Sequence, residues 1–220
     1  MADMTALRTK MVDGQIRPSD VTDHRIIDAM LAIPREAFVP AGLTGLAYLD
    51  RNLPVSADGR SRCLIQPMVL ARMVQAAEVG PDDVVLEIGC ASGYGAALLA
   101  RLASSVVALE EDESLADMAA GALSGLGVDN VTVVKGPLAA GYPDEGPYDV
   151  IFVNGAVEVA PEALAGQLKQ GGRMVLVVGV GQAARGMLYT RSGAGVSGRV
   201  IMNASVPLLP GFARIPAFEF

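Results

Sequence analysis

The chain has 220 residues, enough for one sizeable hydrophobic core, and its composition does not require two domains. A net charge of −7 disfavours DNA or RNA as a partner, because nucleic-acid binding needs a local surplus of Lys and Arg. Its apolar runs are too short to cross a bilayer, and residues 1–15 show no export signal, so we expect a cytoplasmic protein without a membrane partner.

Cysteine and histidine are scarce, which limits the possible chemistry. Cys63 and Cys90 cannot form a disulfide framework or a thiolate metal cluster, so no metal site is expected. His24, the sole histidine, opens a predicted helix, where a solvated first-turn residue is the simpler interpretation. Catalysis that depends on histidine is therefore disfavoured.

The N-terminal part predicts a helical cap followed by a long connection. Thr22 or Asp23 can cap a helix whose apolar spacing continues until Pro34. Residues 41–62 are rich in Gly, Pro, Asp and Arg without periodicity, which predicts an ordered connection of functional interest. Pro67 fits the first turn of the next helix.

From residue 84 onward, predicted strands and helices alternate. Apolar runs predict strands at 84–88, 106–109, 131–134, 149–153 and 174–178. Helices are expected at about 94–102, at 115–126, and from Pro161 to the Gly171-Gly172 pair. This alternation predicts a Rossmann-like, doubly wound α/β fold. Runs at 187–190 and 199–206 add an antiparallel C-terminal hairpin, which gives a seven-stranded mixed sheet.

A glycine-rich segment, Glu87-Ile-Gly-Cys-Ala-Ser-Gly-Tyr-Gly95, lies between the first of these strands and its helix. A ligand can bind backbone N–H groups at such a helix N-terminus. Tyr94 occupies a position where a dinucleotide fingerprint needs a small residue, and no Gly-Lys-Ser/Thr of a phosphate-binding loop follows. A tight turn without a ligand is the structural alternative.

Glu110 ends the next strand, about 20 residues beyond Gly89, where an acid accepts hydrogen bonds from ribose hydroxyls. The strand and the loop together predict a site for a cofactor that contains a nucleoside. The acids that follow, from Glu111 to Glu113, are interpreted as a solvated run that favours the N-terminus of the next helix.

Four further segments carry a family pattern: Pro34-Arg-Glu-Ala-Phe-Val-Pro40, Gln66 to Met73, Tyr148 to Ala156 and Gln167-Leu-Lys-Gln-Gly-Gly-Arg173. With the glycine-rich loop and Glu110, they resemble protein-L-isoaspartate O-methyltransferases, which are class I S-adenosylmethionine-dependent enzymes. The likeness covers nearly the whole chain. It implies a protein-repair methyltransferase that uses S-adenosyl-L-methionine and transfers methyl to a carboxylate of damaged Asp or Asn sites in a peptide or protein.

The resemblance also implies residue roles. Glu87 stands near the cationic methionine end of the cofactor, and Pro137 replaces an Asp that approaches the adenine. Ala91 replaces the middle glycine of the usual motif, a mild change if that backbone needs no positive φ. The residues expected at the cofactor are Gln66, Glu87, Gly89, Cys90, Ala91, Gly93, Tyr94, Glu110, Glu111, Pro137, Leu138 and Asn154.

The acceptor side departs from the family. A Thr-Ile-Ser triplet, whose hydroxyls sit at the substrate carboxylate, is replaced here by Cys63-Leu64-Ile65. A carboxylate without polar partners binds poorly. Ser61, Arg62 and Gln66 are candidates to compensate, and Arg62 offers a guanidinium fork for a carboxylate. An exposed loop cation is an equally good interpretation of Arg62. No catalytic residue is assigned, and the acceptor-side candidates are Arg62, Cys63, Ile65 and Gln66.

Three functions stay open at this stage. Isoaspartyl methylation leads, followed by an S-adenosylmethionine-dependent methyltransferase with another small-molecule or protein acceptor, and then by a cofactor-binding pseudoenzyme. In each case we expect one domain, with a cap and substrate-side loop at 1–66, a cofactor-binding core at 67–180, and a hairpin and tail at 181–220. The oligomeric state and the roles of Cys63 and Cys90 are left open.

Overall fold

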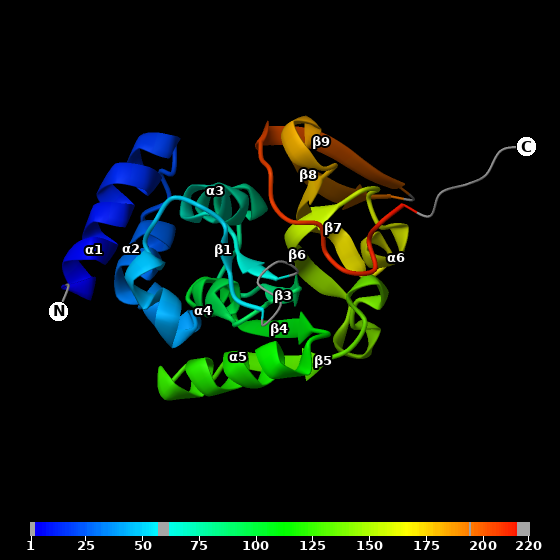
Figure 1. Cartoon of the computed structure of the whole chain (residues 1–220). Coiled ribbons are helices and arrows are strands. Elements are labelled where there is room, and N and C mark those ends of the chain that lie inside the picture. The colour runs from blue at the N-terminus through cyan, green and yellow to red at the C-terminus, as the bar shows by residue number, and fades with distance from the viewer. Residues whose placement is uncertain (1–2, 57–61, 194, 215–220) are drawn as a thin grey trace, which may run out of the picture.

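The computed structural model describes residues 3–56, 62–193 and 195–214, and its centre is a seven-stranded sheet with the order β5-β4-β3-β6-β7-β8-β9 (Figure 1). These strands are β3 (Val84–Ile88), β4 (Ser105–Glu110), β5 (Val131–Lys135), β6 (Tyr148–Val157), β7 (Leu168–Val178), β8 (Arg185–Ser192) and β9 (Gly195–Asn203). The helices are α1 (Met4–Met11), α2 (His24–Ala32), α3 (Pro67–Ala77), α4 (Tyr94–Ala100), α5 (Glu113–Gly125) and α6 (Glu162–Ala165). A separate antiparallel pair joins β1 (Leu53–Pro54) to β2 (Cys63–Leu64).

Strand directions confirm the predicted fold class. Strands β3 to β7 run parallel, whereas β8 pairs antiparallel with both β7 and β9. The result is a Rossmann-like α/β sheet with an antiparallel C-terminal edge. None of the helices in the described residues is long and apolar enough to span a membrane.

Side chains on each strand alternate between the two faces of the sheet. On one face, Val85 of β3 and Phe152 of β6 join a hydrophobic core that includes residues of α1 to α5. On the opposite face, Leu86 and Ile151 pack with α6 and with the C-terminal segment around Leu209. The helices α1 and α2 lie beside α3 and α4, at the end of the molecule opposite to β8 and β9 (Figure 1).

The helix predicted between Asp23 and Pro34 forms as α2, and α1 precedes it without having been predicted. Asp23 is the N-cap of α2, since its side chain accepts a hydrogen bond from the backbone N–H of Arg25. His24 is exposed in the first turn. Part of the long connection, residues 57–61, lies outside the described residues.

The segment from Pro161 to Gly172 differs from the prediction of a single helix. Helix α6 ends at Ala165, and β7 continues through the glycine pair. Gly171 has a φ of +78°, and a Cβ on Gly172 would lie 2.8 Å from the carbonyl oxygen of Lys169. The pairing of β6 with β7 shifts register here. The two glycines therefore form an irregularity within a strand and do not end a helix.

Candidate cofactor and acceptor site

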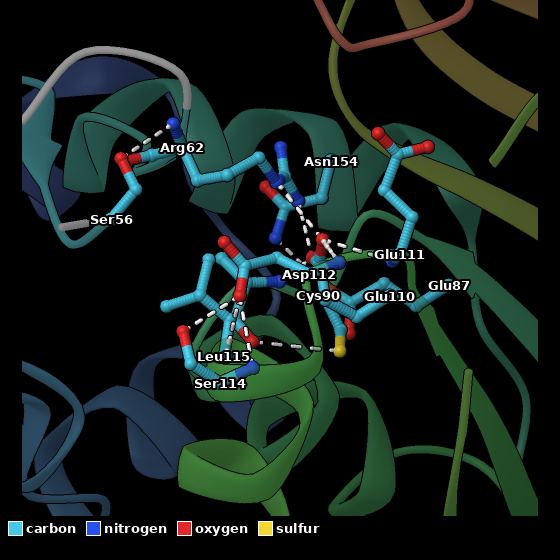
Figure 2. Close-up of polar contacts among 11 residues, drawn as sticks. Ser56, Arg62, Glu87, Cys90, Glu110, Glu111, Asp112, Ser114, Leu115 and Asn154 are labelled. Atoms are coloured by element: carbon cyan, nitrogen blue, oxygen red, sulfur yellow. Dashed lines mark hydrogen bonds and ion pairs between the residues drawn. The ribbon is translucent and has the colours of Figure 1, made fainter. Parts of the chain in front are cut away.

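Three polar side chains lie at the carboxyl ends of neighbouring parallel strands. Glu87 of β3, Glu110 of β4 and Asn154 of β6 are all buried. Because the strand order is β4-β3-β6, they come close together, next to the glycine-rich loop (Figure 2). Ligands of open α/β sheets bind at this edge.

The carboxylate of Glu87 is bonded to Asn154 but keeps unused hydrogen-bonding capacity. The Asn154 Nδ2 donates a 2.8 Å hydrogen bond to Oε1 of Glu87, while Oε2 of Glu87 and Oδ1 of Asn154 have no hydrogen-bond partner among the described residues. Burial raises the pKa of Glu87 to about 8, although the Asn154 hydrogen bond and the charge of Arg62 lower it. Two buried oxygens without donors suit a cationic ammonium group, so the site fits the methionine end of S-adenosylmethionine.

Glu110 is wrapped by backbone N–H groups. Its Oε2 accepts a 2.7 Å hydrogen bond from Ala91 in the glycine-rich loop. Its Oε1 accepts bonds from the backbone nitrogens of Glu111 and Asp112, at 3.1 and 3.2 Å. Asp112 is also the N-cap of α5, so the predicted acidic run does favour the start of that helix.

Arg62 also binds Glu110, and this contact corrects one interpretation of the sequence. Its Nη2 lies 2.6 Å from Oε2 and its Nε lies 3.2 Å from Oε1, a bidentate pair in which both side chains are buried (Figure 2). The alternative of an exposed loop cation is therefore wrong. The guanidinium also lies over Gly89, where a Cβ would be 2.8 Å from Nη2.

Ala91 occupies a strained backbone position. Its φ is +50°, in the left-handed region that favours glycine. Replacement of the motif glycine by Ala91 was expected to be mild only if the backbone here had no positive φ, so this condition is not met. Gly89 and Gly93 on either side also have positive φ values. The loop therefore keeps the glycine conformation at Ala91 without a glycine.

Tyr94 faces the N-terminal cap, which explains why a large residue is tolerated here. Its ring packs edge-on against Phe38 with centroids 5.5 Å apart, and the Arg35 guanidinium lies 4.7 Å from its centroid. The hydroxyl of Ser92 donates to the Phe38 carbonyl at 2.5 Å. These contacts join the N-terminal cap to the glycine-rich loop.

Arg35 connects the cap to the acceptor segment. It is fully buried, and it donates from Nε to the carbonyl of Ala47 at 2.8 Å and from Nη2 to the carbonyl of Ile65 at 2.9 Å. Sequence reasoning did not assign this role. The available signal was the charged pair Arg35-Glu36 within a motif at residues 34–40 whose other residues are apolar.

The acceptor segment is apolar and packed. Cys63, Leu64 and Ile65 are buried, and Leu64 and Ile65 belong to the hydrophobic core under the cap. Gln66 is half-buried, and its backbone N–H donates to the side chain of Asn52 at 2.9 Å. Arg62 and Gln66 thus flank the triplet, but the guanidinium of Arg62 is engaged by Glu110.

The other residues expected at the cofactor differ in exposure. Cys90 is buried, and burial together with the charges of Glu87 and Glu110 raises the pKa of its thiol. Leu138 packs in the second hydrophobic core, whereas Pro137 is exposed. The carboxylate of Glu111 is exposed and points away from the buried cluster (Figure 2).

Leu209 is a residue at this site that sequence reasoning missed. Its side chain would be 3.2 Å from a Cβ on Gly89 and 2.6 Å from a Cβ on Gly155. Backbone hydrogen bonds between Ala156 and residues 207 and 209 hold the C-terminal segment there. No motif marks this contact, because it joins segments far apart in the chain.

Residues 6–209 match the model of the family Protein-L-isoaspartate(D-aspartate) O-methyltransferase (PCMT). The chain belongs to this family. It is 43% identical over 172 residues to the protein-L-isoaspartate O-methyltransferase of Koribacter versatilis (strain Ellin345), covering 78% of this chain and 76% of that relative. Over 212 residues it is 40% identical to the enzyme of the same name from Roseiflexus castenholzii (strain DSM 13941 / HLO8), covering 96% and 95%.

A solved protein-L-isoaspartate O-methyltransferase superposes with a TM-score of 0.82 at 29% identity. The match covers 93% of this chain and 66% of that chain, so this chain spans about two thirds of the length of that structure. These relationships confirm the family resemblance. The chain is an S-adenosylmethionine-dependent O-methyltransferase of the protein-L-isoaspartate type.

Proposed function

We propose that this chain methylates the free carboxylate of isoaspartyl residues in peptides and proteins, with the cofactor held at the carboxyl ends of β3, β4 and β6. The observation that supports this most is the unsaturated pair Glu87 and Asn154 beside the N–H-lined carboxylate of Glu110. A tight turn without a ligand needs neither buried acid.

Each polar group has a separate proposed task. The free oxygens of Glu87 and Asn154 accept hydrogen bonds from the ammonium group of the cofactor, and Glu110 accepts bonds from its ribose. The backbone from Gly89 to Gly93 borders the same site, and Leu138 and Pro137 form its adenine side. When bound, S-adenosylmethionine supplies a methyl group on a cationic sulfur.

The chain's contribution to transfer is alignment and exclusion of water. The acceptor is already an ionised carboxylate, so no proton has to be removed from it. One wall of the acceptor side is made of the buried side chains of Cys63, Leu64 and Ile65, which exclude water. The polar groups proposed to hold the acceptor carboxylate are Arg62 and Gln66. This wall lacks the two family hydroxyls, so we propose that transfer is slow.

The test compares two synthetic peptides that differ only in one residue, isoaspartate or ordinary aspartate. Production of S-adenosylhomocysteine and of a base-labile methyl ester is measured for each peptide, beside a panel of small carboxylic acids. Ester formation on the isoaspartyl peptide alone supports the proposal. Transfer to small acids alone indicates another acceptor, and cofactor binding without any transfer indicates a pseudoenzyme. Either of these two results overturns the proposal.

A further inference from the structure

The carboxylate of Glu110 has no free capacity for a ligand. Within the part of the chain that the structure describes, three backbone N–H groups and two guanidinium N–H groups donate to its two oxygens. An ionised carboxylate offers about four lone-pair sites. Any new donor must therefore replace one that is already there.

Of these five donors, only the two of Arg62 can be exchanged without unfolding the site. The donors Ala91, Glu111 and Asp112 belong to the backbone of the loop and of the start of α5. Arg62 is a side chain, and it donates one bond to each oxygen of Glu110. The two adjacent hydroxyls of a ribose would donate in the same pattern, one to each oxygen.

The position of the guanidinium supports the same exchange. It lies against the Cα of Gly89, in the space that the missing side chain of this glycine leaves open. Glycine at this place in a nucleotide-binding loop permits close approach of a ligand to the backbone. Arg62 thus occupies both the hydrogen-bond acceptor and the space that the cofactor needs.

We infer that Arg62 competes with the ribose of S-adenosylmethionine for Glu110 and thereby inhibits cofactor binding from within the chain. The inference rests on the cofactor role proposed for Glu110. Cofactor binding requires the ion pair to break, and the backbone of Arg62 stays in place, since it bonds to Val55 and to the hydroxyl of Ser56.

Titration calorimetry with S-adenosylhomocysteine tests the inference on the full chain. Arg62→Gln removes the competing cation and keeps a polar side chain. It should bind the ligand at least tenfold more tightly than the unmodified chain, because the ion pair no longer has to be broken. Arg101→Gln, a change at an exposed arginine just after α4, is the matched control and should bind unchanged.

Two results separate the inference from the proposed function. If the unmodified chain binds S-adenosylhomocysteine and Arg62→Gln binds it equally or more weakly, competition is refuted while the cofactor assignment stands. If neither protein binds the ligand, the cofactor assignment fails and the inference fails with it.

A second measurement needs no variant and covers the case in which Arg62→Gln does not fold. In the unmodified chain, the buried Nε–H of Arg62 should be protected from solvent exchange in an ¹⁵N spectrum. Addition of S-adenosylhomocysteine should remove this protection. Retained protection at saturating ligand would show that Arg62 stays on Glu110, and would overturn the inference.

Discussion

Gly95 lies directly against Glu87: a Cβ on this glycine would be 2.0 Å from Oε1 of Glu87 and 2.9 Å from Nδ2 of Asn154. The first turn of α4 can approach the buried carboxylate of Glu87 this closely only because Gly95 has no side chain. Position 95 therefore controls where the carboxylate of Glu87 sits. This contact makes the glycine a requirement of the site and not only of the turn.

Gly95→Ala should displace Glu87, break its hydrogen bond to Asn154 and cost about 1–3 kcal/mol of unfolding free energy. Affinity for S-adenosylhomocysteine should fall about tenfold or more. Urea unfolding and calorimetry measure the two effects. Gly121→Ala in α5 is the control, because the added Cβ would meet no atom of the described residues within 4 Å beyond its neighbours and its own helix backbone; it should gain about 0.5–1 kcal/mol. If both variants showed the same unfolding free energy and the same affinity, the contact between position 95 and Glu87 would not control the site.

Glu87 should make the protein less stable as the pH rises. Its pKa is about 8 in the folded chain against an ordinary value of 4.5, so between these values the folded state holds a proton that the unfolded state has lost. The unfolding free energy should therefore fall by at most about 1.4 kcal/mol per pH unit over this window. Glu87→Gln should flatten the curve, and Glu145→Gln, a change at an exposed acid, should not. Parallel curves for all three proteins would rule out the raised pKa.

The regular elements of the fold were predictable because they follow local patterns. The apolar runs of the parallel strands identify them, since both faces of the sheet are buried. The end of α6 was not predictable, because the conformation of the Gly171-Gly172 pair depends on the neighbouring strand β6. Locally, two glycines after a helical pattern indicate a helix end.

The site was predictable only in part, for a similar reason. Spacing relative to the glycine-rich loop predicts Glu110, and the family resemblance implies Glu87. The structure brings both carboxylates together, and their roles toward the cofactor stay predictions. The pairing of Arg62 with Glu110 and the contact of Leu209 with Gly89 join segments far apart in the chain. These two contacts form because the fold buries both partners together, and no local sequence motif predicts that burial.

Ala91→Gly should leave stability nearly unchanged. Glycine adopts the φ of +50° without the strain of about 1–2 kcal/mol that a Cβ causes, but it loses a buried methyl group and gains freedom in the unfolded chain. These effects should cancel to within about 0.5–1 kcal/mol in chemical unfolding. Ala120→Gly, in the exposed interior of α5, has no strain to relieve and should lose about 1 kcal/mol. An equal loss in both variants would mean that position 91 is not strained.

Arg35→Met should destabilise the chain by about 3 kcal/mol or more. The change leaves the carbonyls of Ala47 and Ile65 without their buried donor, and each such loss costs about 1–3 kcal/mol. Urea unfolding should show an earlier midpoint, while Arg101→Met at the exposed position changes stability by less than about 0.5 kcal/mol. A small effect at Arg35 would show that water satisfies these carbonyls.

The double change Cys63→Thr and Ile65→Ser should raise isoaspartyl methylation, because it restores two hydroxyls at the acceptor carboxylate. Donors of this kind in a desolvated site are worth on the order of 10²-fold in rate. The gain should appear in kcat/KM for the isoaspartyl peptide, with affinity for S-adenosylhomocysteine nearly unchanged. Ile65 is a core side chain with 2% exposure, so its replacement by Ser should also cost about 2–4 kcal/mol of stability.

The matched control is Cys63→Val with Ile65→Val, which keeps an apolar wall of similar shape and adds no hydroxyl. It should leave kcat/KM at the level of the unmodified chain, because the acceptor side lacks hydroxyl groups and a change in side-chain volume alone does not supply them. An increase in this control as large as in the hydroxyl pair would assign the effect to packing. If the unmodified chain already methylates the isoaspartyl peptide rapidly and the hydroxyl pair adds nothing, then Arg62, Gln66 or backbone N–H groups hold the carboxylate. The loss of the family hydroxyls would in that case have no functional cost.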